Sequence, residues 1–177
     1  MDKIIITKQM ILDAQDYVPY AQKEEWVGKY AQNCFDRLAI TADGEEMPPM
    51  YAVNVGLKNR YLMGALAHYL GVGYKTEADS EELMSVEDYD KWAGSHVMNQ
   101  LDRLKKDAEI RDKCYDILYD FRELEKLLSA QIYGFLTVQN DSVIRQSQQM
   151  ANSVRELPQI LEQLKELQEA KESGEQS

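Results

Sequence analysis

Apolar residues between positions 110 and 135 recur at the spacing of one face of an α-helix. The steps between them are 4, 3, 4, 3, 4, 4 and 3 residues, so one face stays apolar over about seven helical turns. Further leucines flank this stripe and make it wider than a coiled-coil seam. Because other helices have to cover so wide a stripe, the pattern predicts an all-α helical bundle organised around this segment. The stripe consists of Ile110, Cys114, Ile117, Phe121, Leu124, Leu128, Ile132 and Phe135.

Residues 1–70 are predicted to supply N-terminal helices that pack on this stripe. Thr7 is a suitable N-cap for a first helix over about 8–17, because its hydroxyl can accept from a free backbone N–H of the first turn. A second helix is predicted over about 20–38, where apolar residues again recur at helical spacing.

A loop is predicted over 39–49, which contains the turn dipeptide Asp43–Gly44. The following stretch 51–55 could be extended, because its valines are β-branched and its pattern is ambiguous. From Leu57 onward the pattern is helical, and Gly71 is placed to end that helix as a C-cap glycine.

A long central helix, or a spine of two helices, is predicted over 85–139, with Ser85 as its N-cap. The apolar face turns by about 200° just before Ile110. Either one helix changes its packing partners within 105–109, or two helices meet there. The absence of Gly and Pro from 96–132 favours one long helix.

A C-terminal amphipathic helix is predicted over 141–171, after a break at Asn140. Its stripe steps by 4, 3, 4, 3, 4 and 3 residues, and Pro158 predicts a kink or the start of a new helix. Residues 172–177 are predicted to be a disordered tail, and 1–171 a single helical domain. The stripe consists of Val143, Ser147, Met150, Val154, Leu157, Leu161 and Leu164.

Charge and cysteine content restrict the classes of function. The net charge of −11 argues against direct nucleic-acid binding, because phosphate contacts need clustered Lys and Arg. Cys34 and Cys114 lie in apolar helical contexts, which predicts two buried free thiols and a reducing, cytoplasmic setting. No segment approaches the 18 or more apolar residues of a membrane span, so no membrane association is predicted.

Candidate metal ligands are few. The chain has two histidines, and neither stands in the Glu-x-x-His pattern of carboxylate bundles. Asp88 and His96 would share a helix face and form a partial metal site. The commoner interpretation is a surface histidine, so neither a metal nor a cofactor is predicted. The acidic side chains of the central segment alternate with basic ones, which is typical of a solvated, ion-paired face; they are Glu109, Asp112, Asp116, Asp120 and Glu123.

Motifs for catalysis are also lacking. The stretch Gly71–Thr76 does not have the adjacent Gly-Lys-Thr of a phosphate loop, and no Gly-x-Ser-x-Gly is present. We therefore predict no catalytic residue and a non-enzymatic protein.

Two features indicate protein partners. The chain has 11 tyrosines and 3 phenylalanines, and tyrosine is frequent at interfaces. The C-terminal stripe can dock on the chain's own core or on another subunit, and a homo-oligomer is predicted. The interface candidates are Tyr51, Tyr61, Tyr69, Tyr74, Val143, Met150, Val154, Leu157, Leu161 and Leu164.

Three short stretches carry a resemblance to a group of proteins: Ile6–Lys8, Leu57–Leu62 and Leu118–Leu124. Together they resemble small uncharacterised helical proteins encoded among phage or prophage structural genes of Gram-positive bacteria. The resemblance implies a role in virion assembly or head–tail joining, and a protein that can be associated with the virion.

The leading hypothesis is therefore a protein–protein interaction or assembly protein of a phage or prophage. One alternative is a small helical metal- or ligand-binding protein or enzyme that uses His96 and Asp88. A second alternative is a nucleic-acid-associated regulator, which would need a basic face.

Overall fold

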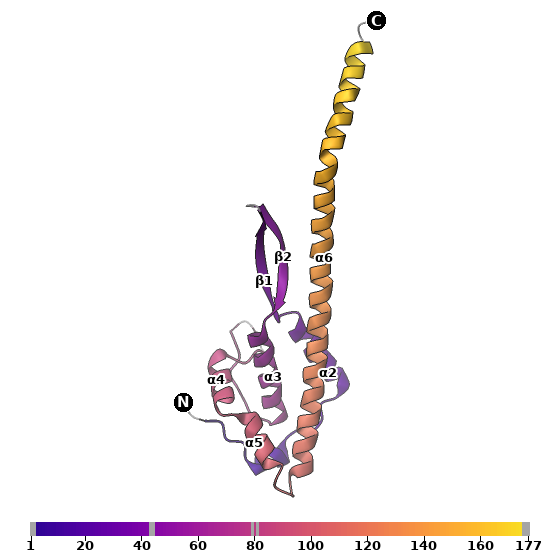
Figure 1. Ribbon diagram of the computed structural model, residues 1–177. Helices are drawn as coiled ribbons and strands as arrows, with labels where there is room; N and C mark the ends of the chain where they lie inside the picture. The colour runs from indigo at the N-terminus through magenta and orange to yellow at the C-terminus, as the bar shows by residue number, and fades with distance from the viewer. Residues whose placement is uncertain (1–2, 43–44, 79, 81, 175–177) are drawn as a thin grey trace. The chain divides into compact units, whose positions relative to one another are not determined.

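The computed structural model describes residues 3–42, 45–78, 80 and 82–174. Within these ranges the side chains are also described, except at 40–48, 156, 159–161, 163–164 and 166–174. The described chain is mostly helical, with one small two-stranded antiparallel hairpin (Figure 1). Contacts divide it into two compact units, one made of 1–36 and 52–136 and the other of 37–51 and 137–177.

The first unit is a helical bundle. Figure 1 shows its shorter helices gathered around the beginning of the last helix, α6. These elements are α1 (Lys8–Asp13), α2 (Tyr20–Ala31), α3 (Val55–Tyr69), α4 (Val86–Gly94), α5 (Val97–Leu104) and the first part of α6 (Arg111–Gly174).

The predicted central stripe is confirmed as the core of this unit. Its residues from Ile110 to Ile132 are all buried, and Phe135 at its end is half-buried. Aromatic rings complete the core: Tyr69 of α3 meets Phe121 of α6 edge to face, with 6.2 Å between the ring centroids. Both cysteines are buried and free, as predicted.

Three predicted helix ends are confirmed, two by hydrogen bonds and one by its backbone conformation. The Thr7 hydroxyl accepts from the N–H of Met10, and the Ser85 hydroxyl accepts from the N–H of Asp88. After α3, Gly71 adopts φ +64°, the left-handed conformation that closes a helix at low cost for glycine.

The prediction of one long helix over 85–139 is wrong. The segment contains two short helices, α4 and α5, before α6 starts at Arg111. His96 between α4 and α5 has a left-handed φ of 51°. Turns occupy 105–110, where Asp107 accepts from the N–H of Glu109. The rotation of the apolar stripe before Ile110 therefore marks a junction between two helices, so the alternative in which two helices meet at 105–109 is the correct one there.

The prediction of helix over 32–38 and loop over 39–49 is also wrong. Residues 32–34 form a turn, and a hairpin of β1 (Phe35–Ala42) and β2 (Glu45–Val53) follows. Pro48 and Pro49 are tolerated in β2 because a two-stranded sheet has only edge strands. The extended alternative for 51–55 holds as far as Val53, and the predicted turn at Asp43–Gly44 lies outside the described residues.

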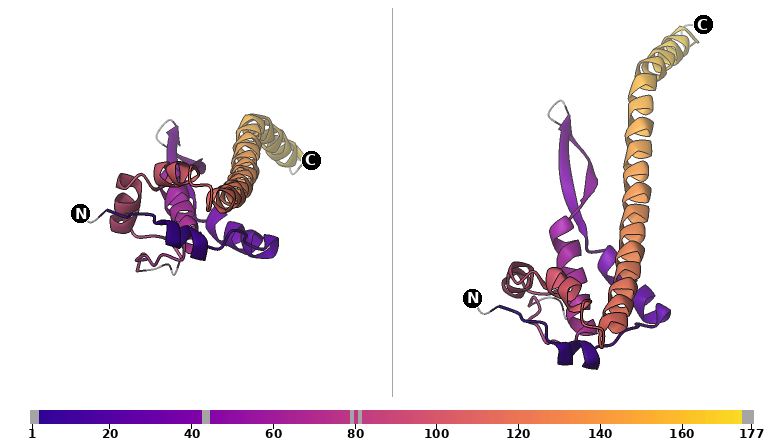
Figure 2. Two further views of the ribbon diagram at one scale, coloured as in Figure 1. Left: turned by 90° about the horizontal axis from the view of Figure 1, so that it is seen from below. Right: turned by 60° about the horizontal axis from the view of Figure 1, so that its bottom comes forward.

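The second unit contains most of the hairpin and the rest of α6. The predicted break at Asn140 is wrong, because α6 runs without interruption to Gly174. Pro158 lies inside it, and a proline removes one helical hydrogen bond and kinks the axis. The right-hand view of Figure 2 shows α6 bent toward its C-terminal end. Residues 172–174 of the predicted tail are helical, and 175–177 lie outside the described residues.

Candidate functional site

The apolar stripe of α6 continues past the core of the first unit and becomes exposed. Val143 is half-buried, whereas Met150 is 60%, Val154 63% and Leu157 51% exposed. Large apolar side chains in a row on one helix face are a marker of interaction sites. The two remaining predicted positions are Leu161 and Leu164. Their backbone is helical, and their side chains lie outside the described part of the chain.

The start of this exposed stripe is fixed to the hairpin within the second unit. The Asn140 side-chain amide forms two hydrogen bonds with the backbone of Tyr51. Asn140, Val143 and Ser147 follow one another on a single helix face, and all three are half-buried. Asn140 thus holds the hairpin at the start of the stripe, and the side chains that are more than half exposed begin at Met150.

The exposed part is bordered by uncharged polar side chains. A shallow groove runs along α6 between apolar Met150 and Val154 and their polar neighbours, Gln146, Gln149 and Ser153. An apolar strip with a polar border is the usual organisation of a protein–protein interface.

The predicted tyrosine candidates do not form an exposed surface. Tyr61 and Tyr69 are buried, so their assignment to an interface is wrong. Tyr61 stacks on Tyr30 with 4.3 Å between ring centroids. The Tyr74 hydroxyl donates to the carbonyl of Glu82, and Tyr51 is held through its backbone. Tyrosine content alone does not distinguish core from interface, because the ring suits both.

Sequence reasoning missed a buried ionic cluster in the first unit. The Lys23 ammonium lies 2.5 Å from Asp120 and 2.5 Å from Glu123, and Lys23 and Asp120 are only 1% and 5% exposed. Asp120 also accepts from the Tyr69 hydroxyl at 2.6 Å and from the N–H of Val18 at 2.9 Å. The prediction of a solvated acidic face is therefore wrong at Asp120.

A sequence signal for this cluster existed. Asp120 stands three residues after Ile117 and four before Leu124, on the apolar side of the helix. Burial lowers the pKa of Lys23, but its hydrogen bonds with Asp120 and Glu123 outweigh that effect and raise it. The cluster joins α2, α3, α6 and the segment before α2, which is a structural role.

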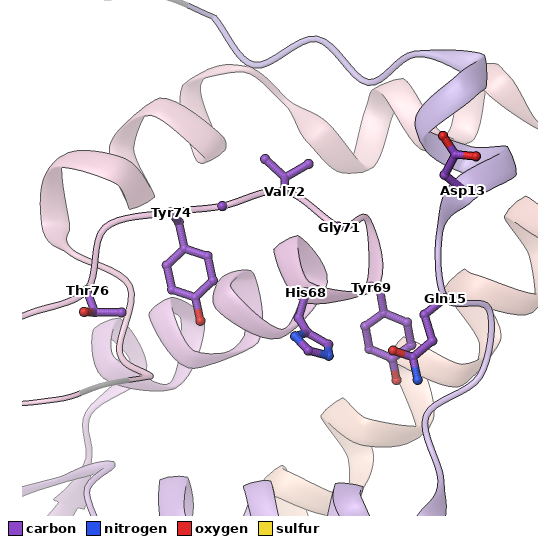
Figure 3. Close-up of a pocket in the computed structure, with 9 residues that line it drawn as sticks. Asp13, Gln15, His68, Tyr69, Gly71, Val72, Tyr74 and Thr76 are labelled. Carbon is purple, nitrogen blue, oxygen red and sulfur yellow. The ribbon is translucent and has the colours of Figure 1, made fainter.

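A surface groove of about 580 Å³ lies beside this cluster in the first unit (Figure 3). Asp13 and Gln15 line it from the N-terminal segment, and His68 and Tyr69 from the end of α3. Burial and the hydrogen bond with Asp120 raise the pKa of Tyr69 strongly, so its hydroxyl stays protonated and serves as a donor to that carboxylate.

The two weak metal candidates do not come together on one helix face. Asp88 lies in the first turn of α4, whereas His96 lies beyond the end of that helix and is exposed. Asp88 accepts from the N–H of Lys75 at 2.7 Å and from the Lys91 ammonium at 2.9 Å. Both interactions lower its pKa, the backbone N–H more than the ammonium. Among the described residues, no group of three or more His, Cys, Asp or Glu side chains is placed to hold a metal ion.

Comparisons with known proteins found no related protein. No protein-family model matches the sequence, and no curated protein or solved structure matches it. None of the described helices combines the length and the apolar composition that a membrane span needs.

Proposed function

We propose that this protein is a non-enzymatic interaction protein that binds another polypeptide chain along the exposed face of α6. The observation that carries the proposal is the row of Met150, Val154 and Leu157, each more than half exposed on a helix whose earlier stripe is a buried core. A partner helix or strand would remove this apolar surface from water, which is the main favourable term in protein association.

The attachment of α6 to the hairpin within the second unit favours this proposal. The Asn140 side chain binds the backbone of Tyr51 at the start of the stripe. The helix that carries the surface is therefore already held at its start, which lowers the ordering cost of binding.

The role in virion assembly that the resemblance implies remains a prediction. An assembly protein acts by binding structural proteins, which agrees with an exposed helix face. Genes for portal, capsid or tail proteins beside the gene of this protein would support the role, and a neighbourhood without them would count against it.

Site-specific photo-crosslinking tests the interaction surface directly. A photoreactive residue placed at Val154 in the full chain is expected to give adducts in the producing cell, identified by mass spectrometry. The same residue at Asn152, exposed on another face of the same helix, is the control. Adducts at neither position, or equal adducts at both, would contradict the proposal.

A further inference from the structure

The exposed stripe of α6 has the period of a coiled-coil seam. From Val143 to Leu164 its positions alternate by four and three residues over three heptads. This gives an average of 3.5 residues per turn, which keeps the stripe facing a second helix that winds around the first. In heptad terms, Val143, Met150, Leu157 and Leu164 occupy one seam position and Ser147, Val154 and Leu161 the other. The partner best suited to this face is thus a helix.

We propose that this partner is a second copy of the same chain, and that two α6 helices pair along the exposed part of this seam, from Met150 to Leu164. This inference rests on the proposed function, because it names the partner of the surface described there.

The distribution of charge along α6 favours an identical partner. Between positions 143 and 164 all charged residues fall on the outer heptad positions; they are Arg145, Arg155, Glu156 and Glu162. The positions that flank the seam carry Ile, Gln, Ala, Ser and Pro. A seam specific for a different helix usually has charged flanks that select an oppositely charged partner. Uncharged flanks let two copies of a chain of net charge −11 approach here without like charges meeting.

Pro158 is compatible with this pairing because of its place in the register. It follows Leu157 and so occupies a flanking position, where its ring does not enter the seam. The kink that it causes is shared by both copies, so the two helices can follow the same bend.

The size of the seam predicts a reversible association. A helix contact about 22 Å long and about 10 Å wide covers roughly 450 Å² in the two copies together. This is below the roughly 1,200 Å² of standard stable complexes. We therefore expect monomer and dimer to exchange with protein concentration.

Sedimentation equilibrium of the full chain tests the proposal. The weight-average mass is expected to rise from the monomer mass of 20.4 kDa toward twice that value as the concentration increases from about 1 µM to about 1 mM. Val154→Glu, which puts a charge into the seam, is expected to weaken association at least about tenfold. Asn152→Glu adds the same charge on an outer position and should leave it unchanged, and Val154→Leu should retain it.

Circular dichroism of each variant shows whether the helices remain folded. A wild-type mass of 20.4 kDa over the whole range, or equal effects of the two glutamate variants, would overturn the proposal. A monomer that still gives Val154-specific crosslinks to a different protein would overturn the second copy as the partner and leave the proposed function intact.

Discussion

Asn140 is bound to Tyr51 through both groups of its side-chain amide. Its Oδ1 accepts from the Tyr51 N–H at 3.0 Å, and its Nδ2 donates to the Tyr51 carbonyl at 3.1 Å. The amide thereby satisfies two backbone groups at the open edge of β2, as the backbone of a third strand would. An isolated two-stranded hairpin is only marginally stable in water, so this contact helps to hold the hairpin on α6.

Replacing Asn140 by alanine should loosen the hairpin at Tyr51. Both hydrogen bonds are lost, and we expect the free energy of local opening to fall by about 1–3 kcal/mol. Amide hydrogen exchange followed by NMR measures this as faster exchange of the Tyr51 N–H. Asn152→Ala, on an exposed face of the same helix, is the control. Unchanged exchange at Tyr51 would show that the amide does not hold the strand.

Lys23→Met should destabilise the helical bundle strongly. It leaves the Asp120 carboxylate buried without its ammonium partner, and breaking a buried pair in this way costs about 3–5 kcal/mol. Lys29→Met is the matched control, because Lys29 is about half exposed and pairs with Glu25 and Glu82 near the surface. Exposed pairs contribute less than about 1 kcal/mol. Urea unfolding measures both, and equal losses would contradict the structural role of the cluster.

The same glycine-to-alanine substitution should have opposite effects at two helical positions. A Cβ at Gly64 of α3 would lie 2.9 Å from the Tyr74 hydroxyl and 3.3 Å from the Glu82 carbonyl, so the loop after α3 would have to move. A Cβ at Gly28 of α2 has no neighbour within 4 Å among the described residues, and alanine favours a helix there by about 1 kcal/mol. Thermal unfolding should therefore show a lower midpoint for Gly64→Ala and a higher one for Gly28→Ala. A higher midpoint for Gly64→Ala would disprove the close packing of Tyr74 on α3.

Asp88 should contribute to the loss of stability in acid. Because the Lys75 N–H and the Lys91 ammonium lower its folded-state pKa, its contribution is complete above its unfolded pKa of about 4 and is lost as the pH falls through the folded value. Asp88→Asn should thus reduce the difference in unfolding free energy between pH 7 and about pH 2. Asp90→Asn, exposed on the same helix, is the comparison. The prediction fails if both variants keep the wild-type difference.

The sequence pattern determines some parts of this fold and leaves others open. The stripe from Ile110 to Ile132 was predictable, because helical spacing over many turns has no other simple explanation. Thr7, Ser85 and Gly71 were predictable as helix ends, since each supplies a local hydrogen bond or backbone conformation.

The missed features depend on contacts between distant residues. The ionic partner of Asp120 is Lys23, which lies 97 positions away, so the acidic residue looked like part of a solvated face. Likewise, Asn140 was predicted to mark a helix break because asparagine is frequent at helix ends. In the structure its side-chain amide forms hydrogen bonds with the backbone of Tyr51, 89 positions away. The C-terminal stripe was predicted from the sequence. Its exposure to solvent from Met150 to Leu157 could be seen only in the structure.

Hydrogen exchange along α6 at low and high protein concentration tests the central claim most directly. The amides of 111–136 belong to the buried core and should be protected at both concentrations. Those of 150–164 should be weakly protected at about 1 µM and clearly protected at about 1 mM, because pairing with a second copy suppresses local opening. Equal exchange of 150–164 at both concentrations would contradict the claim that this face of α6 binds a second copy.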